Sequence, residues 1–161
     1  IDTRGTPARE RYQRLADDAL LPAVGAPVII SLTRWQAEPA LHGRAEVAVE
    51  LPNTLDVLAL DAALLQAPML VLQAPVFSDG RAFSQAMRLR RQHGYSGVLR
   101  VAGPVLPDQI SEWARCGVDE IESPRPLALP AAFATAPAAP YQPDWRQAED
   151  VRQKREQPSL P

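Results

Sequence analysis

The residues whose types and spacing could do chemistry lie in one short stretch, Asp79-Gly80-Arg81. It follows an apolar run and precedes a segment with helical spacing. Asp79 can cap that helix, and Gly80 permits a turn with positive φ or a close backbone approach. Free helix amides beside Arg81 are groups that bind a sulfate- or phosphate-sized anion. The alternative, which the frequency of turn chemistry favours, is a capped turn whose arginine pairs with an acid such as Asp79 or Asp108.

Arg100 is the second candidate, because it is a charged residue inside an apolar stretch that is typical of a buried strand. A buried arginine normally takes acidic partners, so we expect a structural ion pair. Three acids are within reach: Asp108, Asp119 and Glu120. The functional alternative is that Arg100 points into the same crevice as Arg81.

The remaining reactive residue types offer no catalytic or metal-binding pattern. A single cysteine, Cys116, excludes an internal disulfide and a multi-cysteine metal site, and two histidines do not make a histidine-rich one. Cys116 is expected near the end of a helix, where the dipole raises the pKa of a thiol, so we interpret it as an inert residue. No P-loop, dinucleotide, flavin, haem or iron–sulfur motif is present. We therefore predict no cofactor and no metal.

The net charge of −2 and the pI near 5.7 argue against a nucleic-acid partner. No apolar run approaches the roughly 20 residues of a membrane span, so we expect no membrane association. The first residues contain no apolar signal-peptide core. These features predict a cytoplasmic protein.

The candidate residues must be positioned by an alternation of strands and helices. Apolar runs rich in β-branched residues predict five buried strands, at 27–32, 46–51, 69–74, 98–103 and 118–123. Helical spacing is found between them, at 33–42 with an interruption at Pro39, at 54–66, at about 80–93 and at 106–117. This alternation predicts an α/β fold with a mainly parallel sheet of about five strands and flanking helices. We favour a Rossmann-like open sheet, with a partial barrel as the alternative.

The sequence divides into an N-terminal extension at 1–14, an α/β domain at 15–123 and a C-terminal segment at 124–161. The last begins with a strap rich in proline and alanine and ends in a polar tail. Proline lacks an amide donor, so this strap cannot continue a helix or a central strand. It can cover its own domain or dock on a partner, and we favour cover of its own domain.

Ligands of parallel α/β sheets bind beyond the carboxyl ends of the strands, where loops lead into helices. The loops after the predicted strands at 69–74 and 98–103 fall there. The residues of these loops and the helices behind them are the candidates for binding an anion or a partner. They are Asp79, Gly80, Arg81, Ser84, Arg100, Asp108, Gln109 and Arg115.

Three of these stretches occur in a fixed order: FSDGRAFS at 77–84, LRVAGPVLPDQ at 99–109 and RCGVD at 115–119. This order resembles a bacterial family of unknown function with the pattern F-P-x-F-x-D-G-R-x-x-S, L-R-A-x-G-x-V-L-x-D-Q and R-x-G-F-D. The resemblance covers roughly residues 15–142. Residues that depart from the family pattern are Ala74, Val98, Pro104, Pro107 and Val118.

Members of that family are encoded beside sulfite reductase and are described as oxidoreductases of sulfite reduction. The resemblance implies an accessory protein of assimilatory sulfite reduction, with sulfite reductase or another sulfur-assimilation protein as its partner. The alternative is a sulfite- or sulfate-binding enzyme, or an oxidoreductase, of the same pathway. Whether the protein is an enzyme stays open at the level of the sequence.

Overall fold

The computed structural model describes residues 1–3, 6–7 and 10–127. Its centre is one sheet of six strands, all parallel. The strands are β1 Gln13–Arg14, β2 Val28–Ser31, β3 Val47–Leu51, β4 Met69–Gln73, β5 Val98–Ala102 and β6 Glu120–Glu122. The five strands predicted from apolar runs are present. The additional strand, β1, consists of two exposed polar residues, so it gives no apolar signal.

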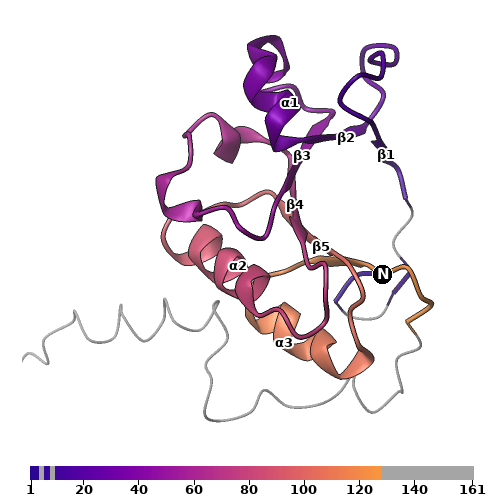
Figure 1. Cartoon of the computed structure of the whole chain (residues 1–161), viewed down its shortest axis with the longest axis vertical. Helices are drawn as coiled ribbons and strands as arrows, with labels where there is room; N and C mark the ends of the chain where they lie inside the picture. Colours follow the sequence, from indigo (N-terminus) through magenta and orange to yellow (C-terminus); the bar gives the residue numbers. More distant parts are fainter. Residues whose placement is uncertain (4–5, 8–9, 128–161) are drawn as a thin grey trace, which may run out of the picture.

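The strands follow one another in the sheet in chain order, from β1 to β6. Each connection therefore steps in the same direction, and right-handed crossovers place every helix on one side of the sheet. Figure 1 shows α1, α2 and α3 on that side and β1 at the far end of the curled sheet. The α/β class is confirmed, and the consecutive order is that of a half-barrel, the alternative to an open sheet. A half-barrel has no switch point at which the strand order reverses.

The helices are short and begin where the sequence offers a cap or a proline. α1 (Leu32–Ala37) begins after Ser31, whose hydroxyl accepts a bond of 3.0 Å from the Arg34 amide, and it ends before Pro39. α2 spans Arg81–Arg91. α3 (Ile110–Arg115) continues a 3₁₀ turn at Pro107–Gln109. Gly117, with a φ of +93°, ends that helix as predicted.

The helix predicted at 54–66 is wrong. This connection between β3 and β4 contains two 3₁₀ turns, at Val57–Ala59 and Leu64–Gln66. Two aspartates explain the difference: the Asp56 carboxylate accepts from the amide of Leu58, and the Asp61 carboxylate accepts from the amide two residues after it. Such local bonds compete with the helical bonds of the backbone. Leu58, in the first of these turns, is 50% exposed.

The two faces of the sheet carry different side chains because successive residues of a strand point in opposite directions. One face packs under the helices and forms the main core, with Leu70, Leu72, Leu99 and Val101 among its buried residues. The other face, called the inner face below, holds a smaller apolar cluster. That cluster consists of Ile29, Ala48, Met69 and Val71, with Tyr12, Val98 and Ala102 packed against it.

α2 and α3 meet through an aromatic pair. The rings of Phe83 and Trp113 stack with centroids 3.5 Å apart and planes inclined by 13°. Ile110 and Trp113 are buried as their spacing predicts, but Leu106 is 38% exposed because it precedes the helical turns instead of lying within them. None of the helices in the described part of the chain is long and apolar enough to cross a membrane.

The first residues of the chain add to the sheet. Ile1 and Ile121 exchange backbone bonds of 2.9 and 2.8 Å, and Asp2 forms an antiparallel bridge with Glu120. The segment that leads into β1 lies on the inner face, where Tyr12 packs against the apolar cluster. The strap and tail beyond residue 127 lie outside the described residues.

Candidate functional site

Five of the eight predicted site residues fall in two separate places: Asp79, Gly80, Arg81 and Gln109 in one, and Arg100 in the other. The first, called the carboxyl-edge cluster, consists of Asn53, Phe77, Asp79, Arg81 and Gln109, on the loops that follow β3, β4 and β5. The second is a pocket around Arg100 on the inner face.

Asp79 is the centre of the carboxyl-edge cluster. Its carboxylate accepts bonds of 3.0 Å from the Arg81 Nε and 2.6 Å from the Arg81 Nη2, and a third of 3.0 Å from the Arg81 backbone amide. The Asn53 side chain donates a further bond of 2.6 Å from the loop after β3. The arginine of the motif therefore holds the aspartate two residues before it, as the turn interpretation predicts.

The hydrogen bonds from Arg81 lower the pKa of Asp79 to about 2, and the same contact raises the pKa of Arg81. Both groups are charged across the physiological range, and the pair is electrically neutral. The Arg81 side chain is still 58% exposed, so its outer edge faces solvent.

Gly80 shows neither of the two features predicted for it, a turn with positive φ or a close backbone approach. Its φ is −76°, and a Cβ added there would meet nothing within 4 Å. It is the N-cap residue of α2 without a side-chain cap, and the Asp79 carboxylate bonds the Arg81 amide in the first turn instead. Ordinary side chains can take this position.

Gln109 joins the loops after β4 and β5. Its side-chain amide donates a bond of 2.9 Å to the Phe77 carbonyl, and its side-chain oxygen accepts from the Leu106 amide at 3.2 Å. The two loops are thereby held side by side, at the lower end of the sheet in Figure 1. Three apolar side chains remain exposed there: Val76 by 52%, Phe77 by 56% and Leu106 by 38%.

The other three predicted residues take no part in these contacts. Ser84 lies on the exposed side of α2, and Asp108 is exposed in the 3₁₀ turn before α3. Arg115 ends α3 and forms an ion pair with Glu112, three residues earlier on the same helix.

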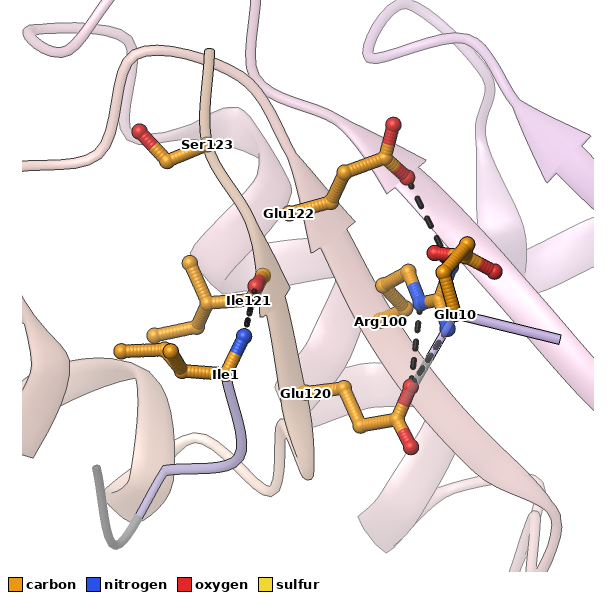
Figure 2. A pocket seen from close by; sticks show the side chains of 7 residues that line it. All are labelled: Ile1, Glu10, Arg100, Glu120, Ile121, Glu122 and Ser123. Atoms are coloured by element: carbon orange, nitrogen blue, oxygen red, sulfur yellow. Dashed lines mark hydrogen bonds and ion pairs between the residues drawn. The ribbon is translucent and has the colours of Figure 1, made fainter. Parts of the chain in front are cut away.

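Arg100 is bound by carboxylates on the inner face. Its guanidinium contacts Glu120 at 2.7 Å, Glu10 at 2.8 Å and Glu122 at 3.6 Å, although its own side chain is only 6% exposed. Figure 2 shows the three carboxylates converging on it from β6 and from the segment before β1. The pocket beside it has a volume of about 190 Å³. Its lining residues are Ile1, Glu10, Arg100, Glu120, Ile121, Glu122 and Ser123.

The electrostatics of this pocket do not suit an anion. Burial acts to lower the pKa of Arg100, but the hydrogen bond to Glu120 and the charges of Glu10 and Glu122 outweigh it, so the pKa is raised. A second arginine, Arg14, pairs with Glu50 at 2.9 Å and with Glu122 at 3.0 Å. Together the two arginines face four carboxylates, which leaves an excess of negative charge.

Arg100 and Arg81 do not share a crevice. Arg100 lies in the middle of β5 and is paired in register with Val71, a residue of the inner face. Arg81 begins α2 at the carboxyl edge. Of the acidic partners expected for Arg100, Glu120 is confirmed, whereas Asp119 instead binds Arg90 at 2.5 Å.

Five partners in these sites were not foreseen: Glu10, Arg14, Glu50, Asn53 and Glu122. Glu10 and Arg14 precede the first apolar run and carry no pattern that would place them on the sheet. The alternation of Glu120, Ile121 and Glu122 does contain a usable signal, because two glutamates in alternate positions must share one face of a strand.

No group of three or more potential metal ligands occurs among the described residues. Burial raises the pKa of the Cys116 thiol to about 11, so this cysteine is protonated at neutral pH and inert as a nucleophile.

Comparison with known proteins gives one match. A family model described as "Bacterial protein of unknown function (DUF934)" matches residues 48–151. The chain belongs to this family. No curated protein and no solved structure matches it. The DUF934 match begins within β3, includes both sites except for Ile1, Glu10 and Arg14, and continues past Leu127 to residue 151.

Proposed function

We propose that this DUF934 protein is an accessory protein of assimilatory sulfite reduction, which acts in the cytoplasm by binding sulfite reductase or another protein of that system. The pathway comes from the resemblance of the motifs at 77–84, 99–109 and 115–119 to a family encoded beside sulfite reductase. The mode of action comes from the carboxyl-edge cluster.

The observation that carries the mode of action is the exposure of Val76, Phe77 and Leu106 on two loops that Gln109 fixes together. Adjoining exposed apolar side chains with a polar rim are typical of protein interaction surfaces. The charged residues of the motif support this role, because Asp79 and Arg81 satisfy one another and hold the loop in shape.

The alternative, an enzyme or carrier that binds sulfite or a similar anion, has weaker support. An anion site built on Arg81 and Arg100 needs both guanidinium groups at one place and free to bind. Each is instead paired with carboxylates, and Arg81 lies at the carboxyl edge whereas Arg100 lies on the inner face.

The proposal is tested by measuring the affinity of the full chain for purified sulfite reductase with biolayer interferometry. We expect binding by the wild type, and at least a tenfold loss in Phe77→Ser and Leu106→Ser, because central apolar residues carry most of the energy of an interface. Leu58→Ser is the matched control, since the 50% exposure of Leu58 lies between those of Phe77 and Leu106, but Leu58 is on the connection between β3 and β4. Absence of binding by the wild type would count against the proposal.

Thermal-shift titration with sulfite, sulfate and phosphate separates the alternative. We expect no change in Tm with any of them. A shift in the wild type that disappears in Arg81→Ala would favour the anion-binding function instead.

A further inference from the structure

The connection between β1 and β2 carries an unbroken apolar stretch on the surface. Its residues 19–27, ALLPAVGAP, contain no polar side chain and are called the apolar loop below. Connections at the surface are ordinarily built from polar and turn-forming residues. Leu20 is nevertheless 92% exposed and Val24 88%, more than the other large apolar side chains in the described part of the chain. Single exposed apolar residues are normal, but a continuous exposed stretch marks a contact site.

The apolar loop is fixed to the protein where it begins. The carbonyl of Ala16 accepts a bond of 2.9 Å from Arg34 of α1, whose side chain is 6% exposed. The carboxylate of Asp17 accepts a bond of 2.6 Å from the hydroxyl of Ser31, the residue that caps the same helix. The residues that lead into the loop are therefore attached to α1.

The middle and the end of the loop are fixed as well. Leu21 packs against the main core. The Gly25 amide donates a bond of 3.4 Å to the Glu46 carboxylate, and Gly25 has a φ of +92°, which turns the chain toward β2. Leu21 is therefore the anchor of the loop, and its neighbour Leu20 is held facing solvent.

The apolar loop is separate from the carboxyl-edge cluster. Figure 1 shows the connection between β1 and β2 beside α1, at the end of the molecule away from α2 and α3. The carboxyl-edge cluster lies at the start of α2, because Arg81 begins that helix. The two exposed apolar surfaces therefore need separate explanations.

The charges beside the loop indicate what it binds. Asp17 and Asp18 precede it and are both exposed. The two arginines beside it, Arg34 and Arg44, are each paired with a glutamate, so they do not offset these aspartates. An apolar surface with a negative border is complementary to an apolar pocket bordered by lysine or arginine.

Other occupants fit these charges and this size less well. A second copy of the loop, or an anionic lipid surface, would place like charges beside Asp17 and Asp18. A neutral membrane offers too little, because a whole myristoyl chain gives only marginal binding and two short side chains bury less. A protein pocket with a basic border is therefore the occupant that the loop favours.

We propose that the apolar loop is a second docking element, which places Leu20 and Val24 in an apolar pocket of the partner protein bordered by basic side chains. The inference rests on the proposed function, because that names sulfite reductase as the partner. Burial of one leucine or valine raises an affinity by about tenfold or more. The two aspartates act earlier, because complementary charge speeds association.

The affinity of the full chain for purified sulfite reductase, measured by biolayer interferometry, tests the docking element. Leu20→Ser and Val24→Ser should each weaken binding by at least about tenfold and leave Tm unchanged, because neither side chain is buried in the fold. Leu58→Ser, on the connection between β3 and β4, is the control and should bind like the wild type.

The outcomes separate this inference from the proposed function. Wild-type affinity in both loop variants, or an equal loss in Leu58→Ser, would overturn the second docking element alone. Loss in the loop variants with full binding by Phe77→Ser would support it and contradict docking through the carboxyl edge. No binding by the wild type would overturn both.

The basic border of the pocket is tested by the association rate of Asp18→Lys. Because Asp18 is exposed, we expect its reversal of charge to lower kon at least threefold at about 0.05 M salt and to have little effect at about 0.5 M, where screening is strong. A kon that is unchanged or raised at low salt would overturn the assignment of a basic partner.

Photo-crosslinking identifies the occupant directly. Leu20 is replaced by benzoylphenylalanine, and the full chain is irradiated together with sulfite reductase. We expect a product in which position 20 is linked to a sulfite reductase subunit. A dimer of this chain, a link within the chain or no product at all would each overturn the proposal.

Discussion

At the scale of single residues, Asp79 gathers the contacts that shape the carboxyl edge. Its carboxylate accepts hydrogen bonds from the backbone and side chain of Arg81 and from the side chain of Asn53. One carboxylate therefore connects the loop after β3 with the loop after β4. The role of this aspartate is to fix a loop, and Arg81 completes the same unit. The motif in the sequence is thus a structural unit that presents its neighbours, Val76 and Phe77, to solvent.

The depressed pKa of Asp79 makes its contribution to stability depend on pH. Its pKa is about 2 in the folded protein against 3.8 ordinarily, so the contribution is complete above about pH 4 and is lost as the pH falls toward 2. We expect the difference in unfolding free energy between the wild type and Asp79→Asn to shrink over that window. Urea unfolding at a series of pH values measures it. A difference that is the same at neutral and acid pH would show that the carboxylate charge is not involved.

Arg100 is the residue whose loss should be most costly among the ion pairs. Replacement by methionine keeps an unbranched apolar stem but leaves Glu120 and its neighbours without their cation, so we expect a loss of about 2–4 kcal/mol in the free energy of unfolding. Arg88→Met is the control. Arg88 and Asp56 are both well exposed and 3.7 Å apart, so the change should be below about 1 kcal/mol. Chemical denaturation distinguishes the two, and equal losses would contradict the assignment.

At the scale of elements, the ends of β4 and β5 approach so closely that only glycine fits between them. Gly103 has a φ of +152°, and a Cβ there would lie 1.9 Å from the Ala74 carbonyl oxygen. We expect Gly103→Ala to cost about 2–4 kcal/mol through clash and backbone strain. Gly80→Ala should change stability by less than about 1 kcal/mol, because that site is open and has an ordinary φ. Thermal unfolding of the two variants tests the contrast.

Strands and helices were predictable from the sequence where the burial of apolar side chains alone determines them. The strands from β2 to β6 follow apolar runs, and α3 follows from Pro107 and the spacing of Ile110 and Trp113. The segment at 54–66 was not predictable from periodicity, because Asp56 and Asp61 bond the backbone locally and divide it into turns.

The candidate site was predictable in part for the same reason. That Arg81 and Arg100 need acids follows from local chemistry, and the acids Asp79 and Glu120 lie on the same loop or the next strand. Contacts between distant segments, such as Glu10 with Arg100 or Asn53 with Asp79, depend on how far the sheet curls. The curvature of the sheet cannot be predicted from a single sequence.

At the scale of the whole molecule, the half-barrel is closed across its inner face by side chains. Arg14 of β1 binds Glu50 of β3 and Glu122 of β6, and Glu10 binds Arg100. The first and last strands are thereby connected although no backbone bond joins them in the described residues. On the inner face the carboxylates outnumber the arginines, so the net negative charge makes this face unsuited to anions. The carboxyl edge is therefore the better candidate for the functional site.

The consecutive strand order also determines how this protein can fold. Each strand from β2 onward pairs with the strand before it. During synthesis on the ribosome, the strand with which each new strand pairs has therefore already been made. Two ion pairs of the inner face join residues 90 and 108 positions apart. The first can form only after β5 has been synthesised, and the second only after β6. We expect pulsed hydrogen exchange during refolding to protect β3 to β5 first and Gln13 and Leu15 last. Simultaneous protection would mean that the sheet and its closure form in one cooperative step.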